Sequence, residues 1–310
     1  MKIVVYGPEK RVGVIRDRDS IMIDAARATG VPSDLAKFIA GGKATLEATR
    51  AAVDKATDGV PLSSVKLHAP CPAGAKVACA GGNFADHAGL MFAKRDKKPF
   101  TPDMVPAFAA EIRKGGIWGF WKISAPVAND DEIIYPSRAK RLDYEGELAI
   151  ILSKPARDVR AADFRDYVWG VTLMSDWSIR DVNEGGPLKF AMQKNFDTSV
   201  SLGPCIVVGE IDPTNAPIET LVNGELRQSF NTKDMVFSFA EYLEHLSRDL
   251  TLQPGDVITG GTAKGTAADS SALMPDGSSD PGPFLKPGDV VEVRSPGLGT
   301  LRNRIVAKAR

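Results

Sequence analysis

The sequence contains few of the residues on which many common binding sites depend, with three cysteines and three histidines in 310 residues. Cys71, Cys79 and Cys205 are odd in number and widely spaced, and no C-x-x-C pair is present. This pattern argues against a disulfide framework and is typical of free thiols in a reducing compartment. We therefore expect a cytoplasmic protein whose cysteines are small buried apolar residues.

The sequence also lacks a net charge and a long apolar run. Lys plus Arg (39) equals Asp plus Glu (39), so no basic excess is available to neutralise phosphates. Nucleic acid and anionic membrane surfaces are therefore not expected as partners. No window approaches the roughly 18 uninterrupted apolar residues of a membrane span. The N-terminal segment MKIVVYGPEK has no small-residue cleavage site and is interpreted as a first strand, not a signal peptide.

Residues 1–72 predict a small α/β domain. Short strands are expected in KIVVYG, RVGVIRD and DSIMIDAA, followed by helices in residues 33–56. Ser33 is the expected N-cap of the first helix, and Gly41-Gly42 predicts a break between the helices. The Pro-rich passage LHAPCPAGAK then marks a domain boundary.

Residues 73–310 predict a larger, mostly β domain. Many short β-like runs are separated by turn residues, among them the hairpin signal Asn223-Gly224 and two PGD turns at 254–256 and 287–289. Ser238 is expected to cap one clear helix, and the polar segment 93–116 is expected to form a helical excursion or lid. The fold class is therefore α+β, mainly β, with the strands closed into a barrel-like or rolled sheet.

Residues 141–150, RLDYEGELAI, place Asp143, Glu145 and Glu147 at every second position. In a β-strand these carboxylates would line one face, where like charges repel. Glu145 and Glu147 adjoin the apolar run LAIIL and are expected to be deepest, whereas Asp143 is interpreted as a turn or capping acid. A solvated strand face is the alternative if the E-x-E pattern is considered alone.

A third acid, Asp176, ends the buried run VTLMSD on another expected strand. Buried carboxylates can gather only if some are protonated or a cation neutralises them. Glu145, Glu147 and Asp176 would form an all-oxygen, trianionic site that suits Mg²⁺, Mn²⁺ or Ca²⁺ better than Zn²⁺. A cation held there could polarise a carbonyl or stabilise an enolate.

Six ordered motifs resemble those of the fumarylacetoacetate hydrolase family over roughly residues 75–308: LDYEGELAIIL, SDWSIRD, KNFDTSVSLGP, VNGELRQSFNTKDMVFSF, LSRDLTLQPGDVITGGT and FLKPGDVVEV. The resemblance implies a mixed β-roll catalytic domain, usually a homodimer. It implies a divalent metal, Mg²⁺ first, on Glu145, Glu147 and Asp176, and a small 2-oxo or 2,4-dioxo acid as substrate.

The same motifs imply roles for further residues. Lys194 would place a positive charge near the substrate oxygens, and Arg180 would bind a substrate carboxylate or, as an equal alternative, form a structural ion pair. Substrate contacts are expected from a glycine–threonine turn and from two residues in motif-like contexts: Gly261, Thr262, Lys122 and Gln228.

His87 in GGNFADHAGLM matches the family's general base, which would activate water. Many small family members have a glutamate three residues later, but Leu90 occupies that place. A partner could come from 93–116 or 265–282, through one of four acids: Glu111, Asp269, Asp276 or Asp280. The sequence leaves this choice open.

Three functions follow. The first is a metal-dependent hydrolase that cleaves a C–C bond in an acylpyruvate-like 2,4-dioxo acid, through a metal-bound enolate. The second is an isomerase or decarboxylase of 2-oxo or 2-hydroxydienoate acids in aromatic catabolism, which Leu90 favours. The third is a dimeric metal-binding protein with a vestigial site, against which the presence of Lys194 and Arg180 argues.

Overall fold

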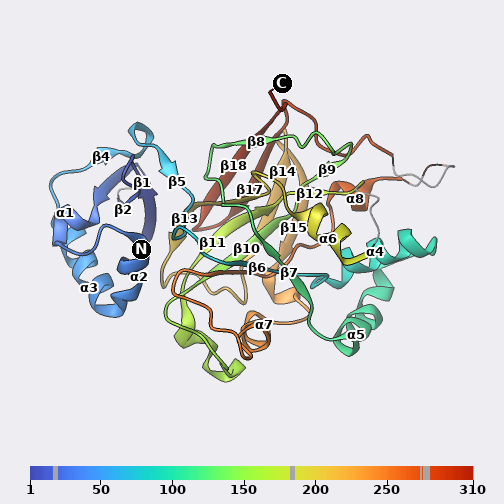
Figure 1. Cartoon of the computed structure of the whole chain (residues 1–310), viewed down its shortest axis with the longest axis horizontal. Coiled ribbons are helices and arrows are strands. Elements are labelled where there is room, and N and C mark those ends of the chain that lie inside the picture. The colour runs from blue at the N-terminus through green and yellow to red at the C-terminus, as the bar shows by residue number, and fades with distance from the viewer. Residues whose placement is uncertain (17–19, 182–185, 273, 275–279, 310) are drawn as a thin grey trace.

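A computed structural model describes residues 1–16, 20–181, 186–272, 274 and 280–309, with side chains of 186–188 left out (Figure 1). Its N-terminal part contains the strands β1 (Lys2–Tyr6), β2 (Arg11–Arg16), β3 (Ile21–Asp24), β4 (Val60–Pro61) and β5 (Leu67–His68). Between them lie α1 (Ala25–Thr29), α2 (Leu35–Ala40), α3 (Gly42–Val53) and the 3₁₀ turn η1 (Leu62–Ser64). The expected small α/β unit is present.

The local signals in this unit were mostly correct. Gly41 ends α2, and Gly42, with a φ of 59°, begins α3, as the Gly-Gly break predicted. The N-cap of α2 is Asp34, whose carboxylate accepts from the Lys37 amide at 3.0 Å. The prediction of Ser33 was therefore wrong by one residue.

The main sheet has the order β4-β3-β2-β1-β13-β11-β10-β16-β6-β7, with β5 paired to β1. Its other strands are β6 (Val77–Ala80), β7 (Gly119–Lys122), β10 (Gly146–Leu152), β11 (Val168–Asp176), β13 (Val200–Val207) and β16 (Val257–Thr259). Because β1 pairs with β13 at Lys2↔Val207, the sheet runs without interruption from the small unit into the large one. The sheet is open, ending at β4 and β7, rather than closed into a barrel, and the expected α+β, mainly β fold class is confirmed.

A second sheet has the order β15-β14-β17-β18-β8. Its strands are β8 (Glu132–Ile134), β14 (Pro217–Val222), β15 (Glu225–Asn231), β17 (Val290–Ser295) and β18 (Gly299–Val306). Asn223-Gly224 forms the expected hairpin, and each PGD turn leads into a strand, β16 or β17. A separate two-stranded sheet joins β9 (Leu142–Asp143) to β12 (Ser178–Ile179).

Strand β10 is buried along all seven residues, which explains its unbroken apolar sequence. One face contributes Leu148, Ile150 and Leu152 to a core shared with the second sheet. The opposite face contributes Ala149 and Ile151 to a core that also contains residues of the N-terminal unit. The end of this strand, where the polar residues begin, is therefore held rigidly between two cores.

The remaining helices surround the large domain: α4 (Ala85–Asp96), α5 (Val105–Gly115), α6 (Gly186–Lys194), α7 (Phe239–Leu246) and α8 (Ala267–Ser270), with 3₁₀ turns η2 (Pro102–Met104), η3 (Ala161–Tyr167) and η4 (Thr232–Asp234). Helices α4 and α5 confirm the helical excursion and lie at the side of the molecule away from the N-terminal unit (Figure 1). Ser238 caps α7 in a capping box with Glu241. None of the helices in the described ranges is long and apolar enough to span a bilayer.

Asp24 ties the first strands of the N-terminal unit together. Its carboxylate accepts from Tyr6 Oη at 2.5 Å, Arg11 Nε at 2.7 Å and the Arg27 amide at 2.9 Å. Burial alone would raise the pKa of Asp24, but the bonds from Arg11 and Tyr6 lower it from 3.8 to about 2. The charged carboxylate is thus favoured in the folded protein.

We predict that Asp24→Asn, which keeps an N-cap oxygen but removes the charge, lowers the free energy of unfolding by about 1–2 kcal/mol at neutral pH. Because the pKa of Asp24 is depressed on folding, its contribution is present above about pH 4 and is lost as pH falls toward about 2. Urea unfolding at several pH values checks this. Asp34→Asn, at an exposed N-cap, is the control; equal losses in both variants at neutral pH would contradict the prediction.

Candidate metal centre and active site

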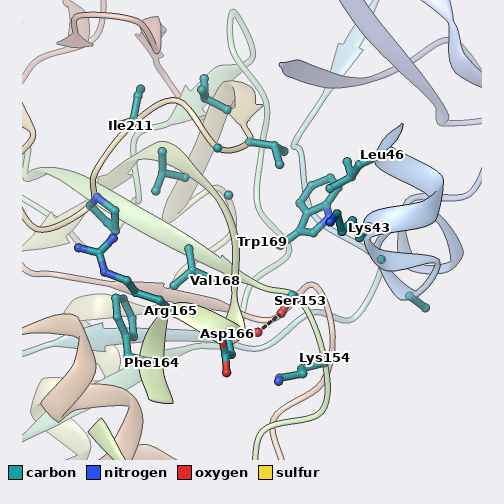
Figure 2. Close-up of a pocket in the computed structure, with 18 residues that line it drawn as sticks. Lys43, Leu46, Ser153, Lys154, Phe164, Arg165, Asp166, Val168, Trp169 and Ile211 are labelled. Carbon is teal, nitrogen blue, oxygen red and sulfur yellow. Dashed lines mark hydrogen bonds between the residues drawn. The ribbon is translucent and has the colours of Figure 1, made fainter. Parts of the chain in front are cut away.

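The acidic cluster opens into a cavity of about 400 Å³ in the large domain. Glu145, Glu147, His87, Arg180 and Lys194 all line it. A different cavity, of about 550 Å³, lies where the N-terminal unit meets the large domain and is lined by Lys43, Arg165 and Trp169, among others (Figure 2). It contains none of the predicted site residues, so the chemistry belongs to the first cavity.

The register of two strands brings the three acids together. Gly146 and Glu147 of β10 pair with Ser175 and Met174 of β11, and the Asp176 amide donates to the Glu145 carbonyl at 2.9 Å. Asp176 therefore stands opposite Glu145, and Glu147 lies two residues away on the same face. Ligand oxygens of the three carboxylates all lie within 4.8 Å of one another.

Residues 141–150 do not form one continuous strand. Asp143 belongs to β9 in the small sheet, and β10 of the main sheet begins at Gly146, with Glu145 in the link between them. A Cβ at Gly146 would lie 2.1 Å from Thr220 Oγ1, so glycine lets the start of β10 pack closely against β14 here. The change of sheet separates Asp143 from the two glutamates.

All three carboxylates are buried, with exposed fractions of 4%, 1% and 1% for Glu145, Glu147 and Asp176. Burial and the charges of Asp176 and Glu145 raise the pKa of Glu147 to about 8. Burial would also raise the pKa of Glu145, but Lys194 and Arg180 hold it well below the usual range. Glu145 and Asp176 pair with Lys194, Arg180 and Lys122, whereas the charged neighbours that most affect the pKa of Glu147 are the two other acids.

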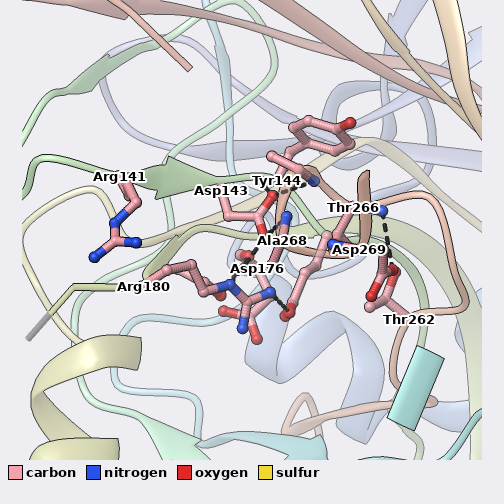
Figure 3. Close-up of polar contacts among 12 residues, drawn as sticks. Arg141, Asp143, Tyr144, Asp176, Arg180, Thr262, Thr266, Ala268 and Asp269 are labelled. Atoms are coloured by element: carbon pink, nitrogen blue, oxygen red, sulfur yellow. Dashed lines mark hydrogen bonds and ion pairs between the residues drawn. The ribbon is translucent and has the colours of Figure 1, made fainter. Parts of the chain in front are cut away.

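Two cations contact the cluster from inside the cavity. Lys194, the last residue of α6, places its ammonium between Glu145 and Asp176, 2.8 Å from Asp176 Oδ2 and 2.7 Å from Ser178 Oγ. Arg180, just after β12, donates from Nε to Asp143 Oδ2 at 2.8 Å and from Nη2 to Glu145 (Figure 3). Lys194 and Arg180 thus fix the orientation of Glu145 with charge-assisted bonds.

Asp143 is a capping acid, as its position predicted. Its carboxylate accepts from the backbone amides of Ala267, at 2.7 Å, and Ala268, at 3.2 Å, at the start of α8. The same carboxylate pairs with Arg180. Asp143 therefore couples α8 to the acidic cluster without belonging to it.

The His87 imidazole has an acidic partner, Asp269 of α8. Nδ1 lies 2.8 Å from Asp269 Oδ2, and Nε2 lies 3.9 Å from Glu145 Oε1, beyond hydrogen-bond range. Asp269 also accepts from the Gly265 and Thr266 amides at 3.0 and 3.2 Å, so its orientation is fixed. With a proton on Nδ1 bonded to Asp269, Nε2 is the basic nitrogen.

Asp269 resolves the choice that the sequence left open. Glu111 is exposed and pairs with Lys114 at 2.6 Å, and Asp280 accepts from the Gly282 amide in a turn. Asp276 lies outside the described residues.

Burial would lower the pKa of His87, but Asp269 and Glu145 outweigh it and raise the pKa above 6.5. Leu90 therefore does not leave His87 without a partner.

A residue that sequence analysis missed, Lys94, fixes the other end of α8. Its ammonium donates to the carbonyls of Asp269 at 2.7 Å and Ser271 at 2.6 Å, and also to that of Ala268. Helix α4, which bears His87, is thereby tied to the helix that bears Asp269. The spacing of His87 and Lys94, two turns apart on one helix, is the one signal in the sequence that could have suggested this.

The glycine–threonine turn lies beside Glu147. Gly261, with a φ of 85°, donates its amide to Glu147 Oε2 at 3.2 Å, and Thr262 lines the cavity. Gln228 Nε2 donates to Thr262 Oγ1 and to the Ala263 carbonyl, both at 2.8 Å. Gln228 therefore holds this turn in place from behind.

The expectation that Lys122 and Gln228 contact substrate needs correction. Neither lines the cavity. The Lys122 ammonium is buried, pairs with Asp176 and donates to the Ser199 carbonyl at 2.8 Å. Both side chains are positioning residues because protein groups already occupy their polar atoms.

The donor set fits a divalent metal ion. Two oxygens bound to one Mg²⁺, Mn²⁺ or Ca²⁺ lie at most about 5 Å apart, as these three do. Oxygen-only donors favour those hard cations, and the position of Lys194 shows that the carboxylates are arranged around a positive charge. Among the described residues no other group of three His, Cys, Asp or Glu side chains converges in this way.

Comparison with known proteins shows which proteins this chain is similar to. A mitochondrial oxaloacetate tautomerase of Bos taurus is 34% identical over 279 residues, which cover 89% of this chain and 81% of that protein. The fumarylacetoacetate hydrolase of Exiguobacterium antarcticum superposes with a TM-score of 0.75, at 29% identity, with 99% and 100% of the two chains covered.

A 5-carboxymethyl-2-hydroxymuconate delta-isomerase of Mycobacterium smegmatis superposes with a TM-score of 0.71, at 25% identity, over the full length of both chains. Hydrolases, isomerases and tautomerases are thus all similar to this chain, which supports an enzymatic role without fixing the reaction. The family model for the fumarylacetoacetate hydrolase C-terminal domain matches residues 76–306. The chain belongs to the fumarylacetoacetate hydrolase family.

Proposed function

We propose that this protein is a metal-dependent hydrolase that cleaves the C3–C4 bond of an acylpyruvate-like 2,4-dioxo acid. The observation that carries the proposal is the His87–Asp269 pair, whose free nitrogen opens into the cavity beside the three acids. An imidazole oriented by a carboxylate is the arrangement that activates water for attack on a carbonyl. The similarity of the chain to the fumarylacetoacetate hydrolase of Exiguobacterium antarcticum also supports hydrolysis.

Glu145, Glu147 and Asp176 would hold the ion, with Mg²⁺ or Mn²⁺ as the expected species. When bound, the ion supplies a Lewis acid that binds the 2-oxo acid group and favours negative charge on its oxygen. Lys194 adds a second positive charge at the same end of the cavity. Arg180, although engaged with Asp143 and Glu145, lines the cavity and orients the substrate end that lies near Glu145.

The proton transfers are assigned to His87. Nε2 takes a proton from water as the water oxygen attacks the C4 carbonyl carbon. The C3–C4 bond then breaks, its electron pair remains on C3 of the pyruvate fragment, and the His87 imidazolium returns the proton to C3. The products are pyruvate and a carboxylic acid. Asp269 holds the tautomer and stabilises the imidazolium throughout.

A second candidate is the keto–enol tautomerisation of oxaloacetate, which the similarity to the Bos taurus tautomerase favours. That reaction moves a proton between C3 and the 2-oxo oxygen and needs no water. The same nitrogen of His87 would carry the proton. The two candidates are separated by measuring carbon–carbon cleavage and tautomerisation on one preparation.

We predict that Glu147→Gln weakens Mn²⁺ binding by about 100-fold or more because it removes one of three charged ligands. In the metal-free protein the same change should not lower stability, since it removes a buried carboxylate that its neighbours repel. Calorimetric titration and thermal unfolding with and without Mn²⁺ measure both effects. Glu219→Gln, on an exposed position of β14, is the matched control; unchanged Mn²⁺ affinity in Glu147→Gln would exclude this site.

We predict pyruvate release from acylpyruvates in the presence of Mg²⁺ or Mn²⁺. Asp269→Asn should lower kcat for this cleavage by about 100-fold or more, because His87 loses the group that fixes its tautomer. Mn²⁺ affinity should stay within about threefold, since Asp269 is not a ligand. Pyruvate is followed by a coupled reductase assay.

Asp86→Asn is the control for that variant because Asp86 adjoins His87 but does not line the cavity. Absence of cleavage for every acylpyruvate, with Mn²⁺ bound, would reject the hydrolase. If the same preparation then interconverted the enol and keto forms of oxaloacetate, the second candidate would stand.

A further inference from the structure

The cavity has two chemically different ends. The charged end contains Glu145, Glu147, Arg180 and Lys194, and the rest of the wall is largely apolar and aromatic. A pyruvate headgroup has about six non-hydrogen atoms and, at about 30 Å³ per water-sized group, fills less than half of 400 Å³. The apolar end therefore has room for another part of the substrate.

Aromatic rings lead outward from the charged end on one side of the cavity. The Lys194 ammonium lies 4.9 Å from the ring centre of Phe120, and Phe120 contacts Phe190 at 5.1 Å. Phe190 in turn meets Trp118 edge to face at 5.5 Å. These rings form a continuous wall from the acidic cluster to the cavity mouth.

The indole of Trp118 is held in a defined place. The backbone carbonyl of Trp118 accepts from Tyr242 Oη at 2.9 Å and from the Gly81 amide at 3.0 Å. A side chain at Gly81 would come within 2.4 Å of the indole ring, so the glycine lets the ring lie against the end of β6. Trp118 nevertheless remains 46% exposed, because it faces the cavity.

Helix α4 forms the opposite wall. Met91 and Phe92 follow His87 by about one turn, about 6–8 Å along the helix axis, and all three line the cavity. Phe92 is 39% exposed and packs against Phe108 of α5 at 5.7 Å. Beyond Phe92 and Trp118 a second cavity, of about 330 Å³, continues between α4 and α5.

From these contacts we infer that the apolar end is a binding subsite for an unbranched aliphatic or aromatic acyl group, which passes between Phe92 and Trp118. The inference rests on the proposed function and names its substrate class: acylpyruvates with an apolar acyl tail. Phe92 and Trp118 line both cavities and are partly exposed, so they lose unfavourable contact with water when such a tail binds.

Arg95 and Lys189 also line the mouth and could instead receive a carboxylate-terminated tail. Arg95 already donates to both oxygens of Asp96, at 2.7 and 3.2 Å, and its guanidinium lies 4.5 Å over the Phe92 ring. This pairing disfavours Arg95 as a receiver of a carboxylate, and a preference for an anionic tail, which Lys189 would receive, is a defined outcome of the test.

The test measures binding of unreactive 2-oxo acids in the presence of Mn²⁺, which separates tail binding from turnover. Pyruvate, 2-oxohexanoate, 2-oxooctanoate, 2-oxo-4-phenylbutanoate and 2-oxoadipate are titrated calorimetrically. Affinity should rise about fourfold for each methylene group that enters the subsite. 2-Oxoadipate should bind less tightly than 2-oxohexanoate.

Trp118→Ala should weaken binding of 2-oxo-4-phenylbutanoate by about tenfold and leave that of oxalate unchanged. Trp121→Ala is the control, since Trp121 lies three residues away and does not line the cavity. Circular dichroism checks that both variants are folded. The ligand series on the unmodified protein does not depend on either variant.

If pyruvate binds but longer apolar tails add no affinity, or if 2-oxoadipate binds best, the inference is overturned while the proposed function stands. If apolar tails add affinity but no acylpyruvate is cleaved, the subsite stands and the hydrolase fails. If none of the 2-oxo acids binds with Mn²⁺ present, both are overturned.

Discussion

Three carboxylates buried against one another create the constraint around which the site is built. Glu145, Glu147 and Asp176 lie within 4.8 Å at their oxygens and are almost inaccessible to water. Their repulsion is costly in a region of low dielectric constant, and the raised pKa of Glu147 expresses that cost. Lys194 reduces it by bridging two of the acids, and a divalent ion would reduce it further. The strand register, two cores and a sheet-crossing glycine hold the acids there.

The same charges help to position the His87–Asp269 pair through Arg180. This side chain bonds Glu145 with one nitrogen and Asp143 with another, and Asp143 caps the first turn of α8 (Figure 3). Lys94 holds the other end of that short helix. Asp269 therefore reaches His87 from a helix whose position depends on the acidic cluster. The arrangement explains how a four-residue helix can orient the His87 imidazole.

Much of the local structure could be predicted from the sequence. The Asn223-Gly224 hairpin, the Ser238 cap and the strands after both PGD turns form as expected, because each depends on neighbouring residues. The two glutamates could be recognised as a pair from the E-x-E spacing and the adjoining apolar run. Asp176 could be predicted as the third acid of the site because it ends a second buried run. The boundary proposed at residue 72 remains a prediction.

Features that depend on distant segments could not be predicted. The change of sheet between Asp143 and Gly146 is accompanied by close packing of Gly146 against Thr220, which no local pattern reveals. The choice of Asp269 over the other acids depends on how α8 docks on α4. The burial of Lys122 and Gln228 depends on loops that converge from separate parts of the chain. Local pattern therefore pointed to the acids of the site but not to the side chains that hold them in place.

The central claim is that a divalent ion binds between Glu145, Glu147 and Asp176. Anomalous diffraction at the manganese edge, from crystals grown with Mn²⁺ and oxalate, tests it most directly. The account predicts one strong peak within about 2.0–2.6 Å of an oxygen from each carboxylate, with oxalate completing the coordination. A peak at another place, or none at saturating Mn²⁺ with the three carboxylates arranged as described, would contradict it.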